Sequence, residues 1–113
     1  MHEMSLMESV IEIICETARL NGARRVKSVR LDVGALSHVD PDALLFCYDA
    51  VRHGTLADRA RLEISRIAGE GWCLDCGTTV ALKERFGACP HCGRHRVQMT
   101  AGDELKIRDM EVI

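Results

Sequence analysis

Two C-x2-C pairs set the strongest constraint on what the last third of this chain can fold into. The first pair is Cys73 and Cys76, the second is Cys89 and Cys92, and twelve residues separate the two pairs. Each turn brings two sulfur atoms to one point, and four thiolates at this spacing are typical of a tetrahedral zinc site. A glycine follows each pair and tolerates the positive φ that such turns favour. The sequence therefore predicts a structural Zn(II) site at these four cysteines.

Other uses of paired cysteines fit this chain less well. A disulfide scaffold suits a secreted protein, but the start of this sequence is acidic and polar and then amphipathic, unlike a signal peptide. We therefore expect a cytoplasmic protein. A thioredoxin-like site would need only one C-x2-C pair. Iron bound by four thiolates stays open as an alternative, because soft sulfur ligands in tetrahedral geometry suit both metals.

Length and charge limit the remaining possibilities. The chain has 113 residues, and 47% of them are hydrophobic. This is enough for one hydrophobic core of modest size and a second, small unit that a metal ion stabilises. The formal net charge is −2, so the chain lacks the overall basic field that holds nucleic acid. No apolar run approaches the ~18 residues that would span a bilayer. We expect neither a nucleic acid nor a membrane as a partner.

Hydrophobic periodicity predicts two helices and several strands. The S-x-x-E pattern that begins at Ser5 predicts the start of the first helix. Alternation over residues 25–33 predicts a half-buried strand, with Asp32 on the polar side. Asp40 followed by proline predicts the cap of a second helix. Further strands are expected over 61–67 and over 105–112, where a change of phase suggests a bulge.

These elements predict an α/β (α+β-like) two-layer fold. Two helices would pack on a small sheet of about three strands, with an inserted zinc-ribbon-like domain. The expected domains are a discontinuous α/β domain of residues 1–68 and 102–113 and a zinc-binding domain of residues 69–101. Gly69, Gly71 and Gly102 are expected to be flexible boundary residues. Metal should supply most of the folding energy of the insertion, because its apolar residues are few; the main ones are Trp72, Val80, Leu82, Phe86 and Val97.

The N-terminal Met1-His2-Glu3 is a second candidate metal site, which we expect to lie ahead of the helix and to be free to wrap around an ion. The Met1 amine, the His2 amide nitrogen and His2 Nδ1 can close two fused chelate rings, and Glu3 can supply a fourth donor. Nitrogen donors in a plane suit Ni(II) or Cu(II). The residues alone favour the alternative, a solvated terminal segment that binds no metal.

Four parts of the chain together carry a family resemblance: the opening Met-His-Glu-Met-Ser, Val-Gly-Ala-Leu-Ser at 33–37, Pro-Asp-Ala-Leu at 41–44, and the C-x2-C pairs. They resemble the HypA/HybF family, nickel metallochaperones that help to load Ni(II) into [NiFe]-hydrogenases. The resemblance implies that His2 is the essential nickel ligand, with Met1 and Glu3 around it. It also implies that the four cysteines bind structural zinc.

The expected role is delivery of nickel and not catalysis. The sequence has no phosphate-binding loop, so energy coupling must come from a partner. The resemblance implies two partners, the nickel-associated GTPase HypB and the precursor of the hydrogenase large subunit. The sequence does not decide whether the chain also forms a homodimer. The apolar first helix is a candidate docking surface. Cys15 and Cys47 occupy apolar helical positions and are expected to be buried.

A zinc-ribbon module for nucleic acid or protein interaction is the alternative function. Arg85, Arg94 and Arg96 near the cysteines favour it. Against it stand a local charge near zero once a four-thiolate zinc is counted, and the small number of aromatic residues for stacking bases. A rubredoxin-like electron carrier would follow if the metal were iron.

Overall fold

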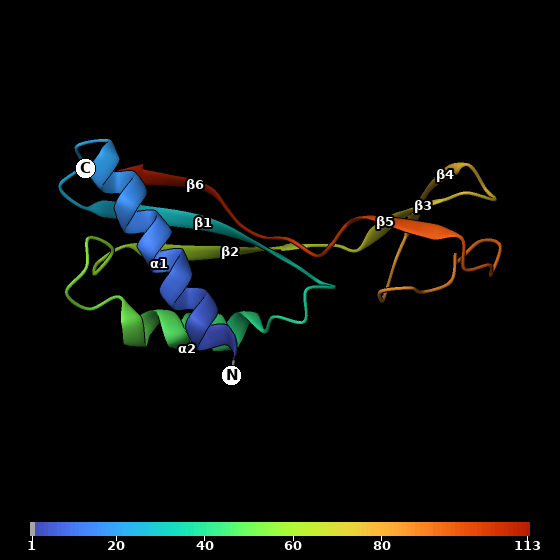
Figure 1. The fold of residues 1–113 in the computed structure, drawn as a ribbon, viewed down its shortest axis with the longest axis horizontal. Coiled ribbons are helices and arrows are strands. Elements are labelled where there is room, and N and C mark those ends of the chain that lie inside the picture. The colour runs from blue at the N-terminus through green and yellow to red at the C-terminus, as the bar shows by residue number, and fades with distance from the viewer. Residues whose placement is uncertain (1) are drawn as a thin grey trace. The chain divides into compact units, whose positions relative to one another are not determined.

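The computed structural model describes residues 2–113, so Met1 lies outside the described part (Figure 1). The predicted class is confirmed, with two helices and small sheets. The elements in chain order are α1 His2–Leu20, β1 Val26–Gly34, α2 Pro41–Val51, β2 Arg61–Ile67, β3 Glu70–Cys73, β4 Thr78–Ala81, β5 Val97–Ala101 and β6 Leu105–Val112. None of the described helices is both long and apolar enough to cross a bilayer.

The chain divides into two compact units. One, here called the helical unit, consists of the residues up to Leu31 together with Val39–Ser65 and Lys106–Ile113. The other, the cysteine unit, consists of Asp32–His38 and Arg66–Leu105. The helical unit holds both helices, and the cysteine unit holds all four residues of the C-x2-C pairs.

Helix α1 begins at His2, three residues earlier than the capping pattern predicted. Ser5 therefore lies inside the helix and caps nothing. Glu3 and Met4 are good helix formers, and no glycine or proline interrupts the first turn. The expectation of a non-helical segment ahead of the helix is wrong for His2 and Glu3. The buried stripe of α1 has helical spacing and consists of Met7, Val10, Ile11, Ile14 and Ala18.

Helix α2 forms as its sequence predicts. The Asp40 side chain accepts a hydrogen bond of 3.0 Å from the Asp42 amide, which satisfies one of the free N–H groups at the helix start. Pro41 occupies the first turn, where no N–H is needed. The buried residues Leu44, Cys47 and Tyr48 lie on one face, and α2 packs against α1.

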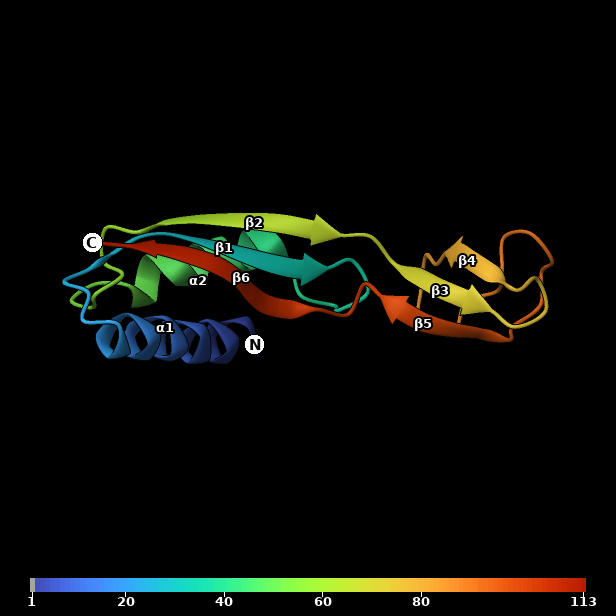
Figure 2. The ribbon, with the colours of Figure 1, turned by 90° about the horizontal axis from the view of Figure 1, so that it is seen from above.

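The sheet of the helical unit has the strand order β2-β1-β6. Figure 2 shows β1 and β2 running in the same direction and β6 in the opposite one. Parallel neighbours need a crossover, and α2 lies in the connection between β1 and β2. Along β1, Val29, Leu31 and Val33 are fully buried. Asp32, expected on the polar side, is also buried at 4% exposure, so this end of β1 is covered on both faces.

The cysteine unit contains a second sheet of three antiparallel strands in the order β4-β3-β5. Its buried cluster consists of Cys73, Val80 and Cys89, with Val97 packed against it. Trp72 is 41% exposed and Phe86 is 91% exposed, so the expectation that they contribute to this core is wrong. The apolar core is even smaller than predicted, and two of its members are cysteines.

Glycines that were expected to be flexible boundary residues are instead packed closely. A Cβ on Gly69 would lie 2.2 Å from the Leu82 oxygen. A Cβ on Gly34, which was not among the expected boundary residues, would lie 2.0 Å from the Gly102 oxygen. Gly102 also has φ +114, which side chains rarely tolerate. These glycines permit close approach of backbones, because any larger residue would collide with main-chain atoms.

Candidate metal centre

The four predicted zinc ligands converge at the end of the second sheet. Cys73 closes β3 and Cys76 lies in the turn before β4, while Cys89 and Cys92 lie in the loop before β5. Their four Sγ atoms all lie within 4.8 Å of one another. Cys73 Sγ is 3.7 Å from Cys92 Sγ, and Cys76 Sγ is 3.9 Å from Cys89 Sγ. A tetrahedral site with Zn–S bonds of about 2.3 Å has sulfur atoms about 3.8 Å apart, so the cluster fits zinc.

Both cysteine turns share one backbone pattern. Gly77 has φ +65 and Gly93 has φ +74. The Gly77 amide donates to the Cys73 oxygen at 2.8 Å, and the Gly93 amide donates to the Cys89 oxygen at 2.9 Å. The positive φ predicted for these glycines is confirmed, and it closes each turn so that two sulfurs face the same point.

Backbone amides are directed at the sulfur atoms. The Cys76 amide donates to Cys73 Sγ at 3.3 Å, and the His91 amide donates to Cys89 Sγ at 3.4 Å. The Cys92 and His91 amides lower the pKa of the Cys89 thiol to about 6, although burial acts in the opposite direction. Hydrogen bonds with Cys73 and Cys92 raise the pKa of Cys76 to about 12. Negative charge is therefore held first at Cys89, where the peptide dipoles stabilise a thiolate.

An ion-pair cluster supports the two cysteine turns. The sequence analysis did not identify Asp75, the acidic residue of this cluster. Asp75 lies between Cys73 and Cys76, and its side chain is only 14% exposed. Its Oδ1 lies 3.0 Å from Arg96 Nη1 and 3.6 Å from Arg94 Nη1. The clue was an acidic residue inside the first turn and two basic residues just after the second.

The arginines that favoured a nucleic-acid module are engaged within the cysteine unit. Arg94 and Arg96 both pair with Asp75. Arg85 Nε donates to the Leu36 carbonyl at 3.0 Å, and its Nη2 lies 4.0 Å from Asp103. These contacts reduce the positive charge available for a phosphate backbone and weaken the alternative function.

The described N-terminal residues place two candidate nickel donors together in the first turn of α1. His2 Nδ1 lies 3.6 Å from Glu3 Oε1, and the side chains are 59% and 13% exposed respectively. The other Glu3 oxygen lies 3.5 Å from the Asp40 amide, at the cap of α2. The first amides of a helix have no hydrogen-bond partner within the helix, so a backbone nitrogen here is free to lose its proton and bind a metal ion. Met1, the third predicted nickel residue, lies outside the described residues.

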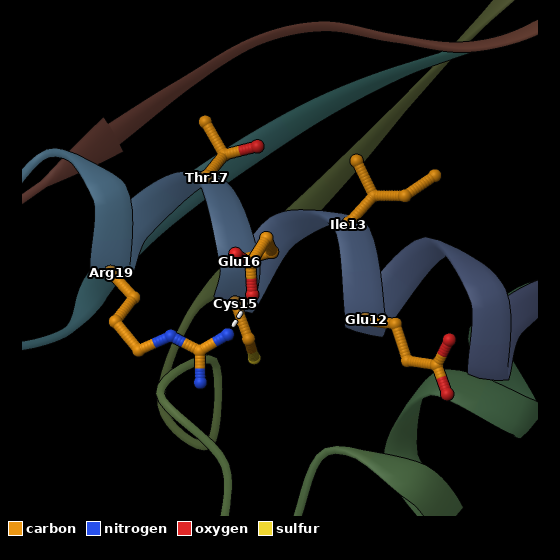
Figure 3. A pocket seen from close by; sticks show the side chains of 6 residues that line it. All are labelled: Glu12, Ile13, Cys15, Glu16, Thr17 and Arg19. Carbon is orange, nitrogen blue, oxygen red and sulfur yellow. Dashed lines mark ion pairs between the residues drawn. The ribbon is translucent and has the colours of Figure 1, made fainter.

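The two remaining cysteines lie apart from both sites. Cys47 is 2% exposed, which confirms the expected burial in α2. Cys15 is only partly buried, contrary to expectation, and it lines a cavity along α1 (Figure 3).

Comparisons with known proteins identify the family. Residues 1–112 match the family model described as HypA, hydrogenase/urease nickel incorporation, metallochaperone. The chain is 88% identical to the hydrogenase maturation factor HypA of Rhizobium leguminosarum bv. viciae over the full length of both proteins. It is 54% identical to that of Methylocella silvestris, over 99% of each chain.

A solved structure agrees with this assignment. The solution structure of the Ni metallochaperone HypA from Helicobacter pylori superimposes with a TM-score of 0.73 at 27% identity, covering 100% of this chain and 98% of that one. The fold, the clustered cysteines and the sequence relatives lead to one conclusion: the chain belongs to the HypA family of nickel metallochaperones for hydrogenase maturation.

Proposed function

We propose that this metallochaperone binds Ni(II) at its N-terminus, through His2 with Met1 and Glu3, and delivers it to the precursor of the [NiFe]-hydrogenase large subunit. The observation that carries this proposal is the 3.6 Å separation of His2 Nδ1 and Glu3 Oε1 in the first turn of α1. An imidazole nitrogen, a carboxylate and a backbone amide nitrogen that gives up its proton on binding form a donor set that suits Ni(II).

The surroundings of this donor set favour binding that can be reversed. The His2 side chain is 59% exposed, so a partner can reach it directly. The positive end of the α1 dipole opposes a cation, and the Glu3 carboxylate offsets that repulsion. The Asp40 amide holds Glu3 from the other side at 3.5 Å. The site therefore combines specific donors with an affinity that allows nickel to be surrendered.

For the cysteine unit we propose a structural Zn(II) held by Cys73, Cys76, Cys89 and Cys92. The sulfur spacing and the amides aimed at sulfur support it. Four thiolates leave no position open for a substrate, so this ion stabilises the fold and performs no catalysis. Nickel binding would then belong to residues 1–68 and 102–113 and zinc binding to residues 69–101, and the chain would not be an enzyme.

The partners and the location follow from the same proposal. Delivery needs an energy source that the sequence lacks, and the GTPase HypB would supply it in the cytoplasm. The hydrogenase precursor would then take the nickel from the exposed His2.

A nickel titration of tag-free, zinc-loaded protein tests the proposal, with both metals quantified. The His2→Ala variant should lose nickel and keep zinc. His95→Ala is the matched control, since it removes an exposed histidine from the cysteine unit, and it should bind nickel as the wild type does. Equal nickel binding by wild type and His2→Ala would refute the N-terminal site and leave the zinc proposal standing.

A further inference from the structure

Three arginines line one small cavity of the helical unit. The cavity has a volume of about 240 Å³ and is lined by Arg24, Arg25 and Arg59, with Thr55, Leu56 and Asp58. Arg24 and Arg25 lie just before β1, and the other residues lie in the loop between α2 and β2. The Val26 amide donates to the Leu56 carbonyl at 2.9 Å, which ties the two walls together. The arginines are therefore presented on fixed backbone from two separate segments.

The charge of this cavity is not balanced from within. None of the three guanidinium groups forms an ion pair with a described residue, and Asp58, the acidic residue in the lining, pairs with His53 at 3.6 Å. Other arginines of the same unit do have carboxylate partners: Arg19 with Glu16, Arg30 with Asp109, Arg52 with Asp49 and Arg61 with Glu63. The unpaired guanidinium groups are thus gathered at one place.

The cavity along α1 provides a contrast. It contains Arg19 but also Glu12 and Glu16, and Figure 3 shows the ion pair between Arg19 and Glu16. Its positive charge is satisfied internally. The cavity of Arg24, Arg25 and Arg59 instead has an excess of two positive charges over its lining carboxylate.

We propose that this cavity, here called the arginine pocket, docks an acidic peptide segment of a partner protein through its carboxylates. Guanidinium groups match carboxylates in charge and in planar geometry. The inference goes beyond the nickel site, because it concerns a different surface and requires no metal there.

The lining favours carboxylates over a bound phosphate. Phosphate sites usually add backbone N–H groups or hydroxyls to their basic residues. Thr55 contributes a side-chain hydroxyl to the lining, but this hydroxyl is already engaged. It donates to the Arg52 carbonyl at 2.7 Å and accepts from the Ala57 amide at 3.1 Å. The arginines remain as the available donors. The three arginines come from two separate segments of the chain, so they can contact several carboxylates along one peptide.

The test uses zinc-loaded, nickel-free protein and a fluorescein-labelled peptide of six glutamates, with binding followed by fluorescence anisotropy. Because nickel is absent, the result does not depend on the N-terminal site. We expect binding at about 20 mM salt that weakens strongly at about 200 mM salt, as exposed charges are screened. Changing Arg24, Arg25 and Arg59 together to Gln should weaken binding at least about tenfold.

The matched control changes Arg19, Arg30 and Arg61 to Gln, which removes the same charge from the same unit but only from paired arginines. It should bind within about twofold of wild type. Equal loss in both triple variants would show a general field effect and overturn the proposal, as would absence of binding by wild type at low salt. Displacement by inorganic phosphate at levels where chloride has no effect would assign the pocket to phosphate instead.

Discussion

Arg96→Gln tests whether the ion-pair cluster behind the cysteine turns helps to retain zinc. Arg96 Nη1 makes the shorter of the two contacts to Asp75, at 3.0 Å, and Arg94 makes the longer at 3.6 Å. Asp75 sits in the first cysteine turn and both arginines follow the second. The ion pairs therefore join the two halves of the proposed zinc site.

Two contributions set the magnitude. The Arg96 side chain is 66% exposed, so solvent screening limits its ion pair to about 0.5–1 kcal/mol. The Asp75 side chain is only 14% exposed, and its Oδ2 is already buried without a hydrogen-bond partner among the described residues. Leaving this carboxylate with the longer contact alone should cost about 1 kcal/mol more. The total is about 1.5–2 kcal/mol.

Zinc binding should report this loss directly, because the small core makes folding of the cysteine unit depend on the metal. A change of about 1.5–2 kcal/mol corresponds to zinc affinity about 10–30-fold weaker. Competition with a chromophoric chelator measures it, and Arg66→Gln is the control, because Arg66 is exposed in the same unit with no ion pair among the described residues. Wild-type zinc affinity in Arg96→Gln would refute the reasoning.

Three further changes test the helical unit and the glycine contacts. Tyr48→Phe should lower the free energy of unfolding by about 1–3 kcal/mol in urea, because the buried Tyr48 hydroxyl shares its one proton between the Ala57 and Ala60 carbonyls. Gly34→Ala should cost about 3 kcal/mol or more, since its Cβ would lie 2.0 Å from the Gly102 oxygen. Arg30 lowers the pKa of Asp109 below its ordinary value of 3.8. The stability that the Asp109 carboxylate adds is therefore present above pH 3.8 and is lost as the pH falls below it. The difference in free energy of unfolding between wild type and Asp109→Asn should shrink as the pH falls.

Each of these changes has its own control or contrary outcome. Gly22→Ala meets nothing within 4 Å and has φ +68, so it should cost only about 1–2 kcal/mol, and a cost equal to that of Gly34→Ala would contradict the collision. Unchanged stability in Tyr48→Phe would contradict a stabilising role for these hydrogen bonds. A difference between wild type and Asp109→Asn that is the same at every pH would exclude the Arg30 ion pair as its cause.

Local signals gave reliable element positions where the deciding interactions lie within a few residues. The Asp40 cap and Pro41 correctly located α2, because capping joins residues two or three apart. The strand expected over 61–67 matched β2. The Ser5 pattern misplaced the start of α1, because a capping sequence is only a local preference and the preceding residues also favour helix.

The sequence did not predict contacts between segments that are distant along the chain. Burial of Asp32 and exposure of Phe86 depend on what covers each residue, which periodicity cannot supply. Gly102 was expected to be a flexible boundary residue, yet it and Gly34 permit two backbones to meet. The convergence on Asp75 likewise joins residues about twenty positions apart.

The sequence by itself determined the four clustered cysteines and the family, because C-x2-C turns are local structures whose spacing dictates metal geometry. It also named His2 and Glu3 as candidate nickel donors. Only the tertiary structure placed their side chains 3.6 Å apart in a helical turn and brought Arg24, Arg25 and Arg59 to one cavity. The physical reason is that which charges become neighbours, and which stay unpaired, depends on how separate segments pack.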